Sequence, residues 1–172
     1  MRRKQSDTAC FSGYRPGKFS YVLKNGNEAY LALRERIGQA ISQALADGYT
    51  GFMVGMADGF DLTAGSVLLE LKDKQPEKAD VNLVAVLPFE GHRVSELWRG
   101  LHQLVLERAD EVITLASKYH PRAYHDRNRY MVDHSSRLIC YYDGIKGGTE
   151  YTVKYAERKG LTIVNVAELK PE

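Results

Sequence analysis

Short apolar runs alternate with amphipathic segments along most of the chain, and this alternation constrains the fold more than any other feature of the sequence. The runs at residues 51–54, 81–87 and 138–142 are almost continuously apolar or aromatic, as strands are when a parallel sheet is buried on both faces. The segments between the runs repeat apolar residues every three or four positions, which predicts helices. Strands that alternate with helices predict an α/β fold: a doubly wound, mostly parallel sheet with right-handed crossovers and helices on both faces.

The length of the chain fits one domain with a sizeable core, because a chain of 172 residues buries roughly 70% of its unfolded surface. We expect a flexible segment at residues 1–7, one domain at residues 8–167 and a tail at residues 168–172. The expected strands are residues 8–12, 51–54, 81–87, 111–116, 138–142 and 162–166. Helices are expected at residues 27–47, after Asp61, at residues 95–108 and 123–133, and after Thr149. In the third of these helices the pattern predicts four inward-facing residues: Leu97, Leu101, Leu104 and Val105.

Glycines follow the carboxyl ends of the expected strands, where ligands bind in open α/β sheets. They are Gly13, Gly55, Gly59, Gly91, Gly147 and Gly148. After the run at 138–142 comes D-G-I-K-G-G-T-E, in which Thr149 is the expected helix N-cap and Glu150 lies in the first turn. A strand, a glycine-rich turn and a capped helix together aim free backbone N–H groups at an anion.

The sequence G-M-A-D-G-F-D after the second strand predicts another such turn. Its last residue, Asp61, would either cap the following helix or accept hydrogen bonds from a ligand hydroxyl. Neither glycine-bearing turn is a G-x-G-x-x-G motif or a Walker A loop. The tyrosines at three expected loop ends offer rings on which a base could stack: Tyr14, Tyr119 and Tyr124.

The composition of the chain bears on its binding partners and on its location in the cell. A net charge of +2 is too small to indicate nucleic-acid binding by itself, and no segment approaches the ~20 apolar residues of a membrane span. Cys10 and Cys140 lie in apolar runs, so we expect buried free thiols in a reducing, cytoplasmic environment. The five histidines include no pair at the helical spacing of a zinc site, so no metal is expected. The sequence leaves open whether the chain forms a homo-oligomer.

Five motifs occur in a fixed order along the chain: F-S-G-Y-R-P, V-G-M-A-D-G-F-D, V-A-V-L-P-F, D-R-N-R-Y-M-V-D and D-G-I-K-G-G-T-E-Y-T. This order resembles the SLOG superfamily, which joins the DNA-processing proteins DprA/Smf to the LOG phosphoribohydrolases. Over residues 8–167 the chain looks most similar to the small stand-alone YpsA/YoqJ-like proteins. The resemblance implies a Rossmann-like fold and a site for a nucleotide or a nucleotide-derived ligand, such as NAD or ADP-ribose; it establishes no cofactor.

Carried over motif by motif, the resemblance implies a set of ligand-binding residues. Gly13 and Arg15 would border the phosphate or base end, and Gly147, Gly148 and Thr149 would hold a phosphate. The central turn would be formed by Gly55, Ala57, Gly59 and Asp61. Arg127 and Asn128 stand in the R-N-R motif, and we expect both to face the same cleft as Gly55 and Gly148.

One departure from the LOG pattern bears on catalysis. LOG enzymes carry P-G-G-x-G-T-x-x-E, whose glutamate serves glycosidic cleavage, and Thr152 takes the position of that glutamate in this chain. Glu150 is offset by two residues, so on a helix it points to another face. This argues against LOG-type hydrolysis, and we expect ligand binding in a sensing or regulatory role.

Two alternative functions stay open. One is an N-glycosidase or phosphoribohydrolase that acts on a nucleoside monophosphate or an NAD derivative. Its carboxylate would come from Asp61, Glu90 or Glu150. The other is single-stranded nucleic-acid binding by an oligomer.

Overall fold

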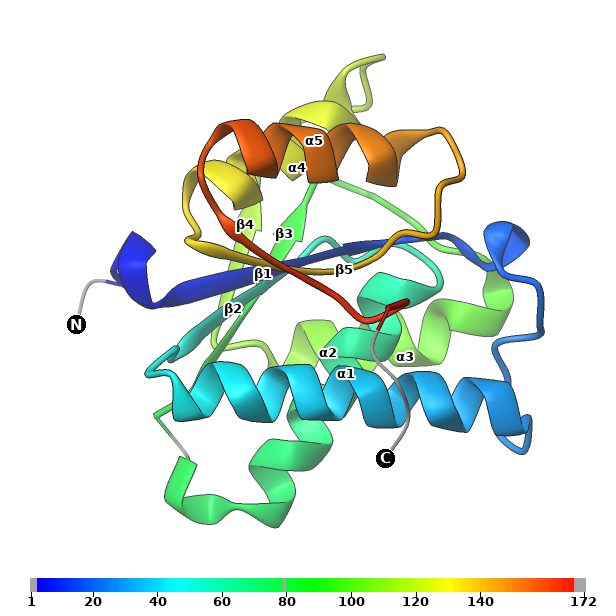
Figure 1. Cartoon of the computed structure of the whole chain (residues 1–172). Helices are drawn as coiled ribbons and strands as arrows, with labels where there is room; N and C mark the ends of the chain where they lie inside the picture. Colours follow the sequence, from blue (N-terminus) through cyan, green and yellow to red (C-terminus); the bar gives the residue numbers. More distant parts are fainter. Residues whose placement is uncertain (1–2, 79, 169–172) are drawn as a thin grey trace.

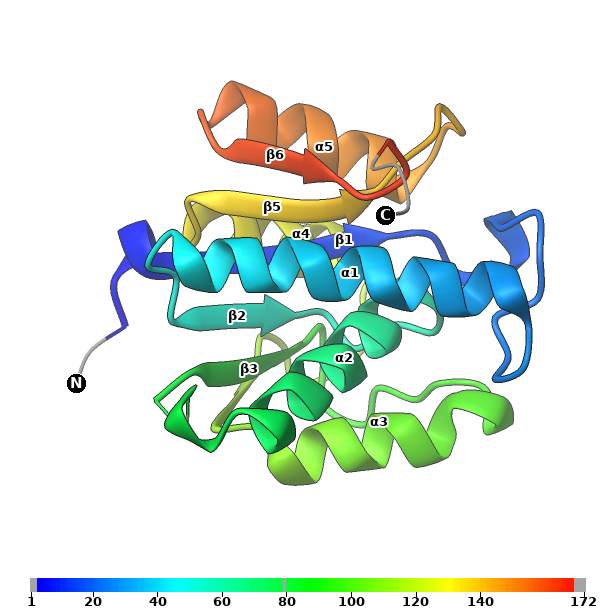
Figure 2. The same cartoon turned by 60° about the horizontal axis from the view of Figure 1, so that its bottom comes forward.

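The computed structural model describes residues 3–78 and 80–168, and within them six strands form one sheet in the order β4-β3-β2-β1-β5-β6. Every neighbouring pair of strands is parallel. Figure 2 shows β6, β5, β1, β2 and β3 side by side, with α1 running along the strands in front of them. The strands are β1 Thr8–Gly13, β2 Gly51–Val54, β3 Asn82–Leu87, β4 Glu111–Thr114, β5 Arg137–Tyr141 and β6 Thr162–Asn165.

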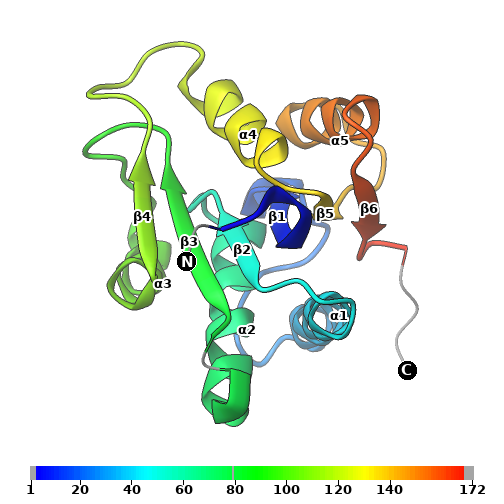
Figure 3. The same cartoon turned by 90° about the vertical axis from the view of Figure 1, so that its left-hand side faces the viewer.

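Helices cover both faces of this sheet (Figures 1 and 3). They are α1 Glu28–Ala46, α2 Phe60–Lys74, α3 Glu96–Arg108, α4 Ala123–Asp133 and α5 Gly148–Arg158. One face carries α1, α2 and α3, and the other carries α4 and α5. The described residues also form three short 3-10 helices: η1 Gln5–Asp7, η2 Pro16–Lys18 and η3 Pro76–Lys78. The predicted Rossmann-like, doubly wound parallel sheet is therefore confirmed.

Alternating side chains of each strand supply two separate cores, as the pleat requires. Ala9 and Phe11 of β1 pack with α1, α2 and α3, whereas Cys10 packs with α4 and α5. Cys10 and Cys140 are both free and buried, and burial raises the pKa of each thiol to about 12. These thiols are therefore packing groups of the core.

After two neighbouring strands, β1 and β5, the chain passes to opposite faces of the sheet. β1 pairs with β2 on one side and with β5 on the other. From β1 the chain proceeds to α1 on one face, and from β5 it proceeds to α5 on the opposite face. This reversal opens a crevice at the carboxyl ends of β1 and β5, which is where ligands bind in such sheets.

The predicted inward face of α3 is confirmed for Leu101 and Val105 and wrong for Leu97 and Leu104. Trp98 and Val105 are buried, whereas the side chain of Leu97 is 94% exposed and Leu104 is also exposed. The helix is turned so that its largest apolar ring faces the core, and Trp98 and Val105 then share one face at the i, i+7 spacing.

The two ends of the chain fall partly outside the described residues. Of the expected flexible segment, residues 1–2 lie outside, while Gln5–Asp7 form η1. Residues 169–172 of the expected tail also lie outside. Among the described residues, no helix combines the length and apolar character that a membrane crossing requires.

Candidate functional site

A cavity of about 160 Å³ opens where the crevice between β1 and β5 is expected. Its walls come from the end of β1, the turns before α2 and α5, and one side of α4. We call it the Arg127 cavity; it is lined by Ser12, Gly13, Tyr14, Arg15, Lys18, Ala57, Asp61, Tyr124, Arg127, Asn128, Gly148 and Thr149.

The guanidinium of Arg127 is the buried cation of this cavity. Arg127 is only 4% exposed. Its Nη1 donates to the backbone oxygen of Gly55 at 2.6 Å, and its Nε donates to Oδ1 of Asn128 at 3.1 Å. Within residues 3–78 and 80–168, no carboxylate lies within 4.0 Å of Arg127 as an ion-pair partner. Burial lowers the pKa of Arg127, which indicates an incompletely compensated charge.

Asp61 is the buried carboxylate of the cavity, at 5% exposure. It accepts a hydrogen bond from the backbone N–H of Ala57 at 3.3 Å. Burial raises the pKa of Asp61, against the opposing charges of Arg127 and Arg15. The alternative in which Asp61 caps α2 is wrong: the N-cap is Gly59, and Asp61 lies inside the first turn.

Positive side chains outnumber negative ones around the cavity. Arg15, Lys18 and Arg127 line it together with the single carboxylate of Asp61. The Cζ atoms of Arg15 and Arg127 lie 5.0 and 5.4 Å from the ring centroid of Tyr124. The ring of Tyr124 therefore holds two cations near each other, and this concentration of charge favours an anionic ligand.

The start of α5 contributes backbone N–H groups. Tyr151 makes the first intrahelical hydrogen bond, to the oxygen of Gly147, so the N–H groups of residues 148–150 have no partner within the helix. Apart from its chain neighbours and the backbone of α5 itself, no described residue has a heavy atom within 4 Å of the position that a Cβ would take at Gly148. A ligand can therefore approach this backbone closely.

The predicted capping role of Thr149 is wrong. The N-cap is Gly147, which makes no side-chain cap, and Thr149 is buried in the first turn of α5. Gly147 adopts a φ of 149°, a conformation that glycine reaches more easily than threonine. The helix therefore begins two residues earlier than the sequence indicates, at Gly148 instead of Glu150.

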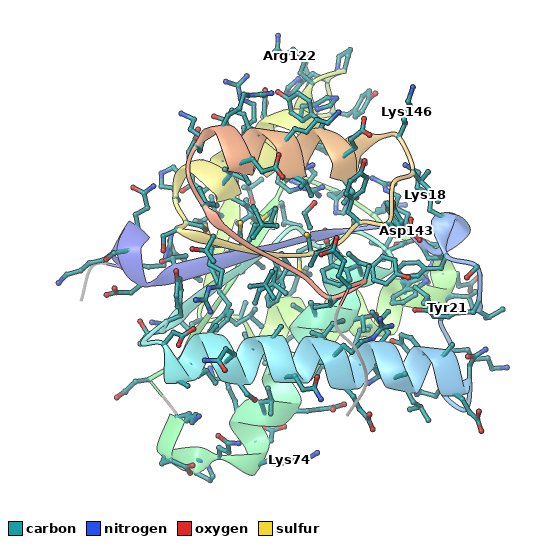
Figure 4. The ribbon with its side chains drawn as sticks, viewed as in Figure 1. Lys18, Tyr21, Lys74, Arg122, Asp143 and Lys146 are labelled. Atoms are coloured by element: carbon teal, nitrogen blue, oxygen red, sulfur yellow. The ribbon has the colours of Figure 1, made fainter. Side chains whose placement is uncertain are left out.

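Tyr14 and Lys18 hold the turn between β5 and α5 in place. The hydroxyl of Tyr14 donates to Oδ1 of Asp143 at 2.8 Å and accepts from the N–H groups of Asp143 and Ile145, both at 3.0 Å. Lys18 donates from Nζ to the oxygen of Lys146 at 3.1 Å. Figure 4 shows Lys18, Asp143 and Lys146 gathered at one end of the molecule. The sequence indicated none of these bonds; the only signal was that Tyr14 directly follows the glycine at the end of β1.

The cavity brings together most of the residues singled out from the sequence. Of that set, those that line it are Gly13, Arg15, Ala57, Asp61, Arg127, Asn128, Gly148 and Thr149. Gly55 lies under Arg127 and Asp61, and Gly59 lies against the Tyr14 backbone. Gly147 is exposed at the start of α5. Four further lining residues are not in the predicted ligand-binding set: Ser12, Tyr14, Lys18 and Tyr124. Of these, the sequence predicts Tyr14 and Tyr124 as rings on which a base could stack.

Of the three candidate catalytic carboxylates, only Asp61 lines the cavity. Glu150 accepts a hydrogen bond from the hydroxyl of Tyr142 at 2.7 Å and pairs with Lys154 at 3.7 Å. The bond from Tyr142 lowers the pKa of Glu150. Glu90 is exposed, in the loop that follows β3.

A match to a known protein-family model shows which family this chain belongs to. A family model named YpsA, with the description "YspA SLOG family", matches residues 9–166. The chain belongs to this SLOG family. It is similar to UPF0398 proteins of Bacillus thuringiensis (strain Al Hakam) and Bacillus cereus (strain AH187), each 24% identical over 156 residues that cover 87% of this chain and 82% of theirs.

Solved structures with the same fold include two DNA processing proteins A (DprA). The protein from Streptococcus pneumoniae aligns with a TM-score of 0.60 at 16% identity, covering 92% of the SLOG chain and 49% of its own. The Helicobacter pylori protein, described in its single-stranded DNA binding mode, aligns with a TM-score of 0.59 at 13% identity, covering 93% and 64%. The chain thus spans about half the length of the Streptococcus protein and under two thirds of the Helicobacter protein. At these identities the likeness shows the shared fold.

Proposed function

We propose that this SLOG protein binds a nucleotide or nucleotide-derived ligand through its phosphate in the Arg127 cavity, in a sensing or regulatory role. The observation that carries the proposal is the convergence of a buried guanidinium with a helix N-terminus. Arg127 is 4% exposed without an acidic ion-pair partner among the described residues, and Gly148 lines the same cavity. A phosphate satisfies both, because it accepts from guanidinium and from backbone N–H groups.

The role of Thr152 supports binding over LOG-type turnover. Its hydroxyl donates to the backbone oxygen of Gly148 at 2.9 Å, and the residue is buried. At the position where LOG enzymes carry their glutamate, this chain therefore has a hydroxyl that is already engaged within α5. Such a group can neither stabilise an oxocarbenium-like centre as a carboxylate does nor activate water as a base.

A thermal-shift panel tests the proposal with nucleoside monophosphates, NAD and ADP-ribose. A ligand at about 100 times its Kd should stabilise the fold by roughly 2.7 kcal/mol, which for a domain of this size is roughly 5–11 °C in Tm. The substitution Arg15→Gln removes an exposed cation of the cavity and should abolish most of the shift. Lys74→Gln, at the far end of α2 (Figure 4), is the charge-matched control and should keep it. A panel without any shift would reject nucleotide binding.

Hydrolysis of an N-glycosidic bond is a second candidate, favoured by Asp61. This carboxyl lines the cavity, and burial raises its pKa, which is the direction that a proton-donating carboxyl requires. Incubation with nucleoside monophosphates and NAD, followed by chromatography for free base, tests it. Base release that is lost in Asp61→Asn and kept in Glu150→Gln would establish turnover, and no release would exclude it for these substrates.

Single-stranded DNA binding is a third candidate, favoured by the fold shared with the Helicobacter protein and by the three cations of the cavity. Fluorescence anisotropy with a labelled oligothymidylate over a salt series tests it, because phosphate contacts give a steep salt dependence. Light scattering of the same mixture reports whether an oligomer binds. Anisotropy that stays unchanged at low salt would remove this candidate.

A further inference from the structure

A second cavity, of about 390 Å³, lies between the loop after β3 and the start of α3. We call it the His92 cavity; it is lined by His92, Arg93, Val94, Arg99 and His102. Every polar side chain of this lining is an arginine or a histidine. Neither arginine forms an ion pair within 4.0 Å inside the described part of the chain.

Two ring nitrogens of this cavity are buried without a hydrogen-bond partner among the residues that the structure describes. They are Nδ1 of His92 and Nε2 of His102. His92 is only 8% exposed, so its unpaired nitrogen is costly unless a ligand or water satisfies it. The two rings lie 5.7 Å apart between centroids. An acceptor-rich group in the cavity would satisfy both nitrogens at once when the ring protons are on Nδ1 of His92 and on Nε2 of His102.

The charges around His92 are mostly positive. Burial lowers the pKa of His92 to about 4, and the positive charges of Arg127 on α4 and Arg15 after β1 act in the same direction, as does His102 on α3 when it is protonated. Burial lowers the pKa of His102 as well. Asp58 acts in the opposite direction on both histidines. Its carboxylate already accepts from the N–H of Ser95, at 3.3 and 3.4 Å. The cavity therefore concentrates positive potential with one acidic neighbour, which favours an anion.

Aromatic rings connect the two cavities. Tyr124 lines the Arg127 cavity, and its ring centroid lies 6.0 Å from that of His92. Phe89 lies 5.6 Å from His92 and 6.0 Å from Tyr124. The Arg127 cavity, at about 160 Å³, is smaller than the roughly 300 Å³ at which ligand pockets usually begin. A nucleotide whose phosphate lies there must extend beyond it, and these rings offer it a surface.

We propose that the His92 cavity is a second anion subsite, which takes the second phosphate of a nucleotide whose first phosphate lies against Arg127 and Gly148. The ligand class is a nucleotide with two separated phosphate groups, and its sugar or base would lie along Tyr124. The subsite itself stands on the His92 cavity alone, whereas the two-phosphate ligand rests on the proposed function.

Inorganic phosphate tests the subsite directly. In a titration followed by NMR of the histidine ring C–H signals, we expect saturable shifts for His92 and His102 and a rise in the pKa of His92. Arg93→Gln/Arg99→Gln should abolish the shifts; both arginines are exposed, so this double variant should fold. Gly148→Val, which blocks the other cavity, should keep them. Absent shifts, or shifts that persist in the double arginine variant, would overturn the subsite.

Calorimetry with adenosine 3′,5′-bisphosphate and AMP tests the two-phosphate ligand. We expect the bisphosphate to bind about tenfold more tightly than AMP, as one additional charge-assisted contact would give. The double arginine variant should remove this advantage and leave AMP binding unchanged. Equal affinities in the wild type would overturn the two-phosphate ligand but not the first phosphate site. If neither nucleotide binds, the proposed function fails, and the NMR titration still decides the second subsite.

Discussion

The two glycine-bearing turns of this fold look alike in the sequence and differ in what fills them. After β2, a Cβ at Gly55 would lie 2.9 Å from both Nε of Arg127 and Oδ2 of Asp61. At Gly59 it would lie 2.7 Å from the oxygen of Tyr14. After β5, the corresponding space at Gly148 is empty to 4 Å. A glycine in such a turn thus allows another group to come close to the backbone. Only the packing around the glycine shows whether that group belongs to the protein or whether space is left for a ligand.

The turn after β2 is closed by the protein itself. The N–H of Phe60 donates to the oxygen of Tyr14 at 3.1 Å, so the start of α2 is tied to the segment after β1. Met56 in this turn is buried and has a φ of 67°, a conformation that costs about 1–3 kcal/mol outside glycine. The surrounding core holds the turn in this shape, whereas the turn after β5 leaves its N–H groups available.

Substitution at Gly59 should have the largest effect on stability. Gly59 has a φ of 90° and a backbone oxygen close to its Cβ position, so Gly59→Ala adds both conformational strain and overpacking. We expect a loss of roughly 3 kcal/mol, or roughly 6–12 °C in Tm. Thermal denaturation of the variant measures it. A loss below 1 °C would mean that the turn after β2 is as open as the turn after β5.

Tyr14 contacts one turn through its backbone oxygen and the other through its hydroxyl. Tyr14→Phe removes only the hydroxyl and so tests the two contacts separately. The substitution keeps the backbone oxygen that closes α2 and removes the hydroxyl that binds Asp143 and Ile145. We expect a loss of about 1–2 kcal/mol, together with weaker nucleotide binding because the start of α5 is less fixed. Denaturation and calorimetry measure the two effects. Hydrogen exchange at the start of α2 should stay unchanged; faster exchange there would show that the two turns are not independent.

Asp61 after β2 and Glu150 after β5 should contribute to folding stability with opposite dependences on pH. The folded state raises the pKa of Asp61 by burial and lowers that of Glu150 through Tyr142. The contribution of Asp61 to stability should therefore be present below its unfolded pKa and lost as pH rises through the folded value. The contribution of Glu150 to stability should be present above its pKa in the unfolded state and lost as pH falls through its pKa in the folded state. Urea denaturation of Asp61→Asn and Glu150→Gln across pH, compared with the wild type, gives both slopes; slopes of the same sign would contradict the assignment.

Gly148→Ala should have the smallest effect on stability. The added methyl meets open space and stands in the first turn of a helix, so we expect a change within about 0.5 kcal/mol. Gly55→Ala is the matched comparison in the turn after β2, where the methyl displaces Arg127 or Asp61, at a cost of roughly 1–3 kcal/mol. Thermal denaturation of both variants compares the turns directly. Equal losses would remove the distinction between them.

The sequence predicted the order of strands and helices because apolar periodicity reflects burial on both faces of the sheet. It also placed Gly148 at the edge of the sheet where the carboxyl ends of parallel strands meet. The resemblance of the R-N-R motif to the SLOG superfamily, and not the strand pattern, put Arg127 and Asn128 at the same crevice, and all three residues line one cavity. It did not predict that the cap of α5 is Gly147, because the cap depends on the conformation that the preceding turn adopts.

The contacts that sequence reasoning missed join distant parts of the chain. Tyr14 and Asp143 are 129 residues apart, and no local pattern reports such a pair. The inward face of α3 was also misjudged at Leu97, since Leu97 and Trp98 are both apolar and only the packing of the helix in the core chooses between them. Periodicity thus predicts elements, whereas tertiary contacts decide their rotation and their ends.

The most direct test of the account is calorimetric titration of Gly148→Val with the nucleotide that gives the largest thermal shift. The valine side chain would occupy the space over the start of α5 that we assign to a phosphate. Gly100→Val is the matched control, because it adds the same side chain in open space on α3. We predict that Gly148→Val folds as the wild type does and binds at least about tenfold more weakly, while Gly100→Val binds normally. Wild-type affinity in Gly148→Val would contradict the account and would move the phosphate to the turn after Gly55.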